Sequence, residues 1–217
     1  HWMVHSFPTR RSSDLFDLPG NIAPESIPHA LNANLPDDIR VFRADEMPED
    51  FDARRHTRGK IYRYRIYNSR INDVFLRRYA WHIKYSLNSD AMQAAANFLV
   101  GEHDFSSFQA ADCAATNAIR RVYVARVIRN GDIIDFEIFA TAFLKQMVRN
   151  IAGTLEMAGC GKIKPEGIVD IMQAVDRSRA GMTAPAHGLT LVKVFYADDP
   201  PPPELAKYIP NSADAPI

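Results

Sequence analysis

The sequence predicts an α+β fold in which an antiparallel sheet carries helices on one face. Strand-like and helix-like segments follow one another without the regular alternation of a doubly wound parallel sheet. Two strand patterns, 120–128 and 133–140, are joined by Arg129-Asn-Gly-Asp132, and an Asn-Gly pair is typical of a tight antiparallel hairpin. Apolar residues recur at helical spacing in 89–100 and 143–157.

Composition places the chain among ordinary globular proteins and excludes several classes. It has 217 residues, 47% of them hydrophobic and 24% charged. The 26 basic residues equal the 26 acidic ones, so only the local distribution of charge can indicate a polyanionic partner. No apolar run reaches the ~18–20 residues of a membrane span, and the first residues lack the apolar core of a signal peptide. We therefore expect a cytoplasmic protein.

The first fifteen residues differ in character from the rest. The segment His5–Leu15 reads HSFPTRRSSDL, which is what a common sequencing-adaptor oligonucleotide encodes in one reading frame. We therefore expect residues 1–15 to be a foreign, disordered leader fused to a truncated gene. A natural Ser/Arg-rich leader is the alternative.

The first expected elements lie between residues 24 and 70. A short amphipathic helix is expected within 24–32, followed by a Pro-terminated turn, a strand at 40–44 and a turn at 47–50. The segment 60–67 alternates Ile, Tyr and Arg, which favours a strand. Alternation predicts that the strand has two faces. These are Ile61, Arg63, Arg65 and Tyr67 on one face, and Tyr62, Tyr64 and Ile66 on the other.

The remaining elements follow from caps and periodicity. Ser89 is the expected N-cap of the helix at 89–100, and Gly101 ends it. We expect a loop at 101–108, in which Asp104 caps the end of the preceding helix, and then the hairpin. A helix at 143–157 ends at Gly159 and another spans 165–175, with Pro165 near its start. A strand at 190–196 precedes a Pro-rich tail.

Local charge points to an RNA partner. The segment Phe51–Arg70 contains seven Arg or Lys residues and one acid, Asp52, with interleaved tyrosines. Clustered basic residues attract a polyanion, and aromatic rings provide stacking surfaces for bases. An edge strand that carries arginines to prevent aggregation explains the same composition.

Arg149 is the second candidate. It lies beside the apolar stripe of the helix at 143–157. An arginine near a core usually pairs with a carboxylate, because burying its charge alone is costly. A surface arginine whose stem covers apolar neighbours is the alternative. Neither the histidines nor Cys113 and Cys160 have metal-ligand spacing, so we expect no metal site.

Six stretches, in order and at similar spacings, resemble the tRNA pseudouridine synthase A family. They are Leu35–Ile39, Phe51–Arg54, Tyr62–Tyr64 with Tyr67-Asn68, Gly101–Phe108, Phe143–Gly153 and Thr183–Leu189. The resemblance covers about residues 16–197. It implies a pseudouridine synthase fold with two RRM-like halves around a basic cleft, and a cytoplasmic homodimer. The implied reaction is isomerisation of uridine to pseudouridine in the tRNA anticodon stem-loop, at tRNA positions 38–40, without cofactor or metal.

The resemblance also implies roles for individual residues. Tyr62 is similar to the tyrosine that stacks on the flipped uracil, and Arg149 to the arginine that keeps the catalytic aspartate ionised. The positions similar to tRNA-binding residues are Phe51, Arg54, Arg55, Arg70, Asp112 and Thr116.

One departure from the family is serious. The family's nucleophilic aspartate lies in an Arg-Thr-Asp-Ala-Gly motif, which the printed sequence does not contain. Its place is about a dozen residues before Phe16, near Val4, and Asp14 has the wrong spacing. We therefore expect this chain to lack pseudouridylation activity. A non-catalytic RNA-binding module and a structural or dimerisation protein are the other hypotheses.

The expected domain organisation follows from the same resemblance. Residues 1–15 are the leader and 16–55 are a remnant of the N-terminal catalytic half. Residues 56–197 form the C-terminal α/β domain, and 198–217 form the tail.

Overall fold

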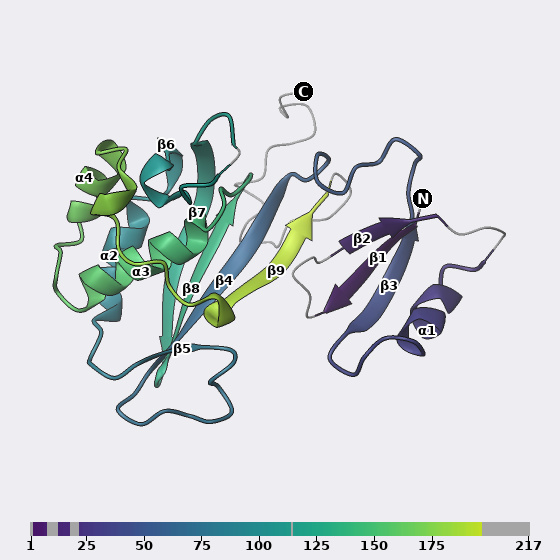
Figure 1. Ribbon diagram of the computed structural model, residues 1–217, viewed down its shortest axis with the longest axis horizontal. Helices are drawn as coiled ribbons and strands as arrows, with labels where there is room; N and C mark the ends of the chain where they lie inside the picture. The colour runs from purple at the N-terminus through teal and green to yellow at the C-terminus, as the bar shows by residue number, and fades with distance from the viewer. Residues whose placement is uncertain (1, 8–12, 18–21, 114, 197–217) are drawn as a thin grey trace.

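The computed structural model describes residues 2–7, 13–17, 22–113 and 115–196, and within them it contains two sheets (Figure 1). The smaller sheet has the strand order β2-β1-β3. The larger sheet has the order β5-β4-β8-β7-β6, and β9 pairs with β4. The smaller sheet comprises β1 (Trp2–Phe7), β2 (Ser13–Phe16) and β3 (Arg40–Glu46). The larger comprises β4 (Gly59–Asn68), β5 (Trp81–Ile83), β6 (Gly101–Asp104), β7 (Ile119–Asn130), β8 (Ile133–Ala140) and β9 (Leu189–Phe195).

Strand pairing in the larger sheet is antiparallel except between β4 and β5. The predicted hairpin joins β7 to β8, and Gly131 in its turn has a φ of 58°. This left-handed conformation suits glycine. β5 and β9 pair with different halves of β4: β5 with Ile66–Asn68, β9 with Gly59–Tyr64.

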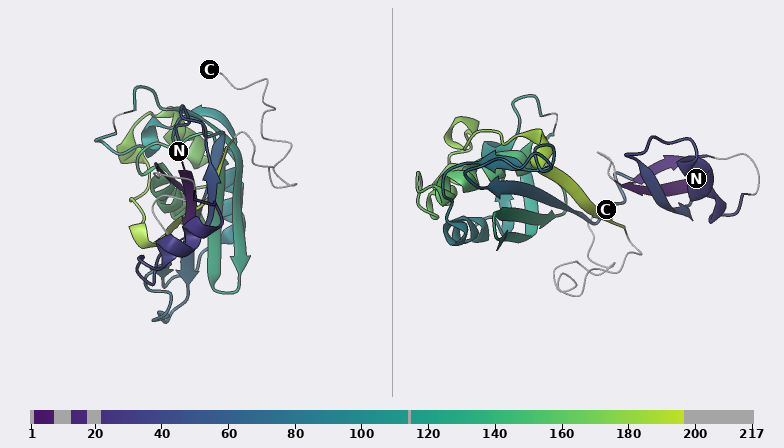
Figure 2. Two further views of the ribbon diagram at one scale, coloured as in Figure 1. Left: turned by 90° about the vertical axis from the view of Figure 1, so that its right-hand side faces the viewer. Right: turned by 90° about the horizontal axis from the view of Figure 1, so that it is seen from below.

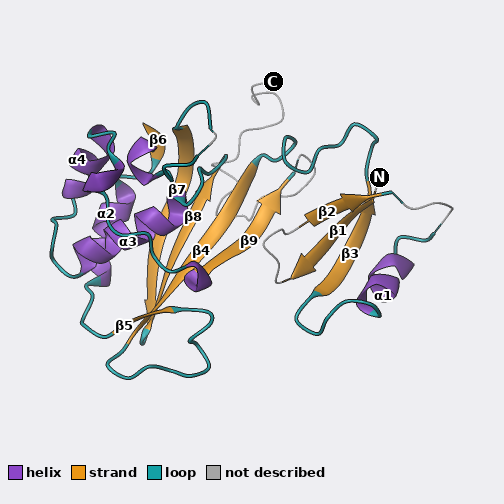
Figure 3. Cartoon of the chain, viewed as in Figure 1, coloured by secondary structure: helices purple, strands orange, loops and turns teal. Residues whose placement is uncertain are grey.

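Three helices cover one face of the larger sheet (Figures 2 and 3). They are α2 (Ser89–Asn97), α3 (Met147–Gly159) and α4 (Gly167–Gln173), whereas α1 (Ser26–Asn32) packs on β3. The core between helices and sheet includes Tyr64, Ile66 and Phe136 of the strands and Met147 and Ile151 of α3. The predicted α+β class, with an antiparallel sheet and helices on one face, is confirmed. The predicted two-faced character of β4 is also confirmed.

The leader is the first point at which the structure differs from expectation. Residues 2–7 and 13–15, predicted to be disordered, lie in β1 and β2, and β1 pairs with both β2 and β3. A strand edge offers unpaired N–H and C=O groups to any extended segment, and this pairing depends little on side-chain identity. The predicted tail at 198–217 lies outside the described residues.

Three local predictions were wrong. Asn88, not Ser89, caps α2, because its Oδ1 accepts hydrogen bonds from the Asp90 and Ala91 amides. The predicted loop at 101–108 contains β6, which pairs with β7, and a 3-10 turn at Ser106–Phe108. Helix α3 begins only at Met147, because Gln146 has a φ of 62° and no helix continues through that conformation.

Candidate functional site

Tyr62 lies on the helix-facing side of β4. It is opposite Ile138 of β8 and Leu191 of β9, and the β4–β9 register shifts immediately before it. Its half-buried ring meets the edge of Phe143, with the ring centroids 4.9 Å apart and the planes at 80°. Burial raises the pKa of the Tyr62 hydroxyl, so the side chain stays neutral near pH 7. The late start of α3 is what frees Phe143 to make this contact.

Arg149 lies in the first turn of α3, and the backbone holds it rather than a carboxylate. Its Nε donates to the Ala184 carbonyl at 2.6 Å, and the Ala184 amide donates to the Arg149 carbonyl at 3.2 Å. Within the part of the chain that the structure describes, no acidic side chain pairs with the guanidinium. The carboxylate partner expected for this arginine is therefore absent from its described surroundings.

The Arg149 charge lies close to Tyr64 of β4. Burial raises the pKa of Tyr64, and the Arg149 charge acts in the opposite direction. The Tyr64 hydroxyl donates to the Pro185 carbonyl at 2.7 Å, next to the Ala184 carbonyl that holds Arg149. Tyr62 and Tyr64 share one face of β4, so a neutral aromatic surface and an uncompensated cation lie on the same side of the sheet.

A buried polar network fixes the segment that holds Arg149. The Asn150 side chain is fully buried, and its Oδ1 accepts from Arg177 Nη2 at 3.0 Å and from Thr183 Oγ1 at 2.7 Å. Thr154 Oγ1 accepts from the Gly181 amide at 2.9 Å. Sequence reasoning missed these positioning residues. Asn150 and Thr183 do lie inside the matched stretches Phe143–Gly153 and Thr183–Leu189, and that was the available signal.

The connection between β3 and β4 presents two arginines. The Asp52 carboxylate accepts hydrogen bonds from the Arg54 and Arg55 amides at 2.7 and 2.9 Å, and these bonds lower the Asp52 pKa. The Phe51 ring packs against the Tyr196 ring, with the centroids 5.2 Å apart and the planes tilted by 59°. Both arginine side chains are exposed. Burial lowers the pKa of Lys60, and the nearby positive charge of Arg54 lowers it further. Lys60 is on the same face of β4 as Tyr62.

Two arginines of the basic segment lie on the other face of the sheet. Arg63 Nη2 is 2.9 Å from Glu137 Oε1, and Arg65 Nη2 is 2.8 Å from Asp135 Oδ2. Their charges are neutralised across the β4–β8 pair. Fewer of the seven basic residues in Phe51–Arg70 are therefore available to bind a polyanion than their number alone predicted.

The loop before β7 is tied to the segment preceding α3. Asp112 pairs with Lys145, which lowers the Asp112 pKa, and the Ala110 amide donates to the Lys145 carbonyl at 3.0 Å. Asp112 and Thr116 are both exposed. The structure thus holds this loop against Lys145, two residues after Phe143 in the chain.

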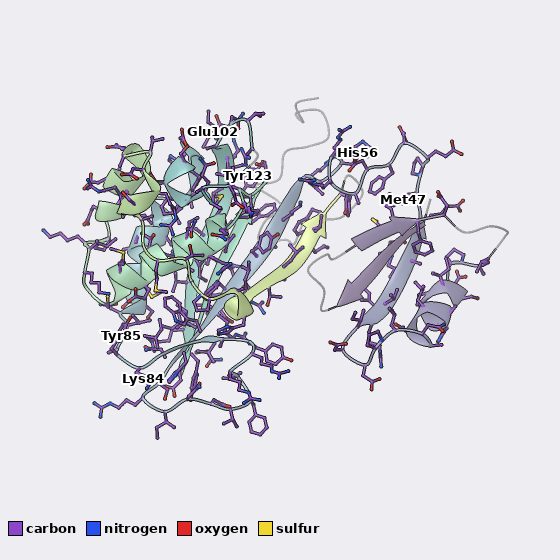
Figure 4. All side chains as sticks on the ribbon, viewed as in Figure 1. Met47, His56, Lys84, Tyr85, Glu102 and Tyr123 are labelled. Carbon is purple, nitrogen blue, oxygen red and sulfur yellow. The ribbon has the colours of Figure 1, made fainter. Side chains whose placement is uncertain are left out.

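Arg70 does not join this group. It lies beyond the far end of β4, and the six residue steps from Tyr62 to Asn68 span about 20 Å of strand. Figure 4 labels His56 near one end of β4 and Tyr85 near the other. Asp104, predicted to cap the end of the preceding helix, instead caps the turn that follows it, since its Oδ1 accepts from the Ser106 amide at 2.8 Å.

The described residues contain no group of three or more His, Cys, Asp or Glu side chains arranged to hold a metal ion. Nor does any helix in these ranges have the length and apolar character of a membrane span.

Comparison with known proteins places the chain in a family. A family model described as tRNA pseudouridine synthase matches residues 95–197. The tRNA pseudouridine synthase A of Thermoanaerobacter sp. (strain X514) is 45% identical over 175 residues, which are 81% of this chain and 72% of that protein. The Myxococcus xanthus protein of the same name is 44% identical over 187 residues, 86% of this chain and 71% of its own length. That of Bacillus subtilis (strain 168) is 45% identical over 181 residues, 83% of this chain and 73% of its own length. The chain therefore belongs to the tRNA pseudouridine synthase A family.

Proposed function

We propose that this chain is a tRNA pseudouridine synthase that recognises the anticodon stem-loop and positions uridines 38–40 for isomerisation. One observation carries the proposal. Tyr62, braced by Phe143, lies on the same side of the sheet as Arg149, whose guanidinium pairs with no acid among the described residues. A stacking ring near an unpaired cation suits a flipped base and an ionised catalytic aspartate.

Different residues of the site bind different parts of the nucleotide. A uridine flipped out of its stack loses a few kcal/mol of stacking and pairing, and a new stack on Tyr62 offsets part of that. Arg54 and Lys60, farther along the same face, attract the phosphates that flank the flipped nucleotide. A carboxylate beside Arg149 would be held ionised by the guanidinium.

The chemistry that follows is an isomerisation. The aspartate attacks the nucleotide, the base detaches and rotates, and it is rejoined to the ribose through carbon. The atoms and electrons of substrate and product are the same, so the overall reaction consumes no oxidant or reductant.

The printed sequence lacks the Arg-Thr-Asp-Ala-Gly motif. Asp14 lies in β2 opposite Val4, in the smaller sheet, which shares no strand with the sheet of Tyr62. We therefore propose that the 217-residue chain binds RNA without isomerising it. We also propose that its first fifteen residues are foreign. A non-catalytic RNA-binding module is the alternative that the missing motif favours. The proposals of a homodimer and of a cytoplasmic location rest on the family resemblance alone.

Binding and catalysis are tested separately. Fluorescence anisotropy with a labelled anticodon stem-loop should show affinity that falls as salt rises. Arg54→Ala should weaken binding and reduce the salt slope by about one, whereas Arg63→Ala, on the ion-paired face, should change neither. Equal losses for the two variants would contradict the assignment of the site to the helix-facing side.

Catalysis is tested by tritium release from uridine-labelled tRNA. The 217-residue chain should not exceed a blank without protein. Release above that blank would show that the chain has a nucleophile we have not identified. An upstream genomic sequence that encodes Arg-Thr-Asp-Ala-Gly would favour the synthase over the non-catalytic module.

A further inference from the structure

The loop between β4 and β5, residues 70–79, exposes aromatic and basic side chains together. Phe75 is 84% exposed and Tyr79 64%, and Ile71 and Val74 beside them are also exposed. Arg70, Arg77 and Arg78 are exposed on the same loop, and none of them has an ion-pair partner in the described ranges. The loop projects at the lower edge of Figure 1.

Hydrogen bonds fix this loop at its base. His82 Nε2 lies 2.8 Å from the Ser69 carbonyl, and His187 Nε2 lies 3.1 Å from the Ala80 carbonyl. Inside the loop, the Asp73 carboxylate accepts from the Phe75 amide at 2.7 Å, and the Tyr79 amide donates to the Leu76 carbonyl at 2.8 Å. The structure thus holds Phe75 in solvent on a turn that its own backbone stabilises.

The segment that fixes Arg149 also supports the loop. Ala184 holds Arg149, Pro185 receives the Tyr64 hydroxyl, and His187 contacts Ala80 at the base of the loop. The loop therefore lies on a continuation of the site, about 20 Å along β4 from Tyr62.

We propose that the loop 70–79 is a second RNA contact, which binds tRNA outside the anticodon loop while Tyr62 holds the target uridine. This inference rests on the proposed function. The arginines attract phosphates, and Phe75 and Tyr79 offer rings to unpaired bases. A second copy of this chain fits less well, because a two-fold contact places each patch against itself and brings three arginines against three.

The test compares two RNAs and three proteins by fluorescence anisotropy. The RNAs are a full-length tRNA transcript and its isolated anticodon stem-loop. The proteins are the unmodified chain, Arg77→Ala/Arg78→Ala, and Lys162→Ala/Lys164→Ala. The last variant is a matched control that removes two exposed positive charges from the α3–α4 connection.

The arginine variant should bind full-length tRNA about tenfold more weakly, with a salt slope lower by about two, and should bind the stem-loop unchanged. Phe75→Ser should weaken tRNA binding by a similar factor without changing the salt slope, since it removes stacking and no charge. The lysine control should bind both RNAs as the unmodified chain does. An unchanged thermal unfolding temperature in each variant shows that a loss of RNA affinity comes from the removed side chain and not from unfolding.

Three results would overturn the proposal. If the arginine variant binds full-length tRNA normally, the loop does not contact RNA. If it loses the stem-loop to the same degree, the contact is not remote from the target. If Phe75→Ser leaves tRNA binding intact but dissociates a dimer in analytical ultracentrifugation, the loop contacts a second copy. Failure of the proposed function looks different, because the unmodified chain would then bind neither RNA in a salt-dependent way.

Discussion

The two faces of β4 differ in whether the arginines that lie on them are paired with acids. On the face away from the helices, Arg63 and Arg65 each meet a carboxylate of β8, at 2.9 and 2.8 Å. On the helix-facing side lie Tyr62, Tyr64 and Arg149, and the Arg149 guanidinium pairs with no carboxylate among the described residues. Charge neutralised within the fold cannot bind a ligand, so the difference shows which cations of the chain are available to RNA.

The largest predicted effect is a loss of stability when the close contact between α3 and the segment that holds Arg149 is disturbed. A Cβ added at Gly153 would lie 1.9 Å from the Met182 carbonyl oxygen, so Gly153→Ala must push α3 away from the segment that holds Arg149. We expect unfolding free energy to fall by about 3 kcal/mol, measured by urea denaturation. Gly167→Ala is the control, since its Cβ would meet only Ile163 at 3.5 Å. Equal stability of the two variants would mean that the close contact at Gly153 does not constrain this side.

Next in size is the stacking contribution of the Tyr62 ring. Tyr62→Ala should weaken binding of the anticodon stem-loop by about 1–3 kcal/mol, whereas Tyr62→Phe keeps the ring and should bind nearly as the unmodified chain does. Tyr123→Ala is the control on the other face, where Tyr123 contacts Phe139 at 5.1 Å. Anisotropy titrations measure all three variants. If Tyr62→Phe loses as much as Tyr62→Ala, the hydroxyl rather than the ring binds the RNA.

A smaller effect is expected from the ion pairs of the opposite face. A double-mutant cycle of Arg65→Ala and Asp135→Ala should give a coupling energy of about 1 kcal/mol in urea unfolding, with no change in RNA affinity. The exposed pair Arg121–Glu102, at 3.1 Å, should give a coupling near zero. A loss of RNA affinity in Arg65→Ala would remove the functional distinction between the faces.

The smallest effect is the pH dependence of the turn that presents Arg54. Hydrogen bonds from the Arg55 and Arg54 amides lower the Asp52 pKa. A carboxyl group whose folded pKa is depressed stabilises the fold above its unfolded pKa, and this contribution is lost as pH falls through the folded value. The amide resonances of Arg54 and Arg55 should therefore shift together below about pH 4. In Asp52→Asn this titration should vanish, and its persistence would assign the shift to another acid.

The correct predictions mostly concern local interactions, although the cap of α2 was placed one residue too late. The alternation of β4 and the Asn-Gly turn each depend on residues within a few positions of one another, and each was predicted. The acid partners of Arg63 and Arg65 were not predicted, because Glu137 and Asp135 are 74 and 70 positions away in the chain. Their pairing depends on strand register, which no local pattern reveals.

The errors near the site have a similar origin. Apolar spacing favoured a helix from Phe143, but tertiary contacts override such a preference. Phe143 packs on Tyr62, and Gln146 adopts the left-handed conformation that precedes α3. The support of Arg149 by Ala184 was hidden for the same reason, because 35 residues separate them.

Photo-crosslinking tests the central claim most directly. An anticodon stem-loop with 4-thiouridine at the target position is irradiated with the 217-residue chain, and the modified peptide is mapped by mass spectrometry. The account predicts a crosslink to Tyr62 or Phe143, lost in Tyr62→Ala. A crosslink confined to the β8 residues that pair with Arg63 and Arg65 would place the RNA on the opposite face and contradict it.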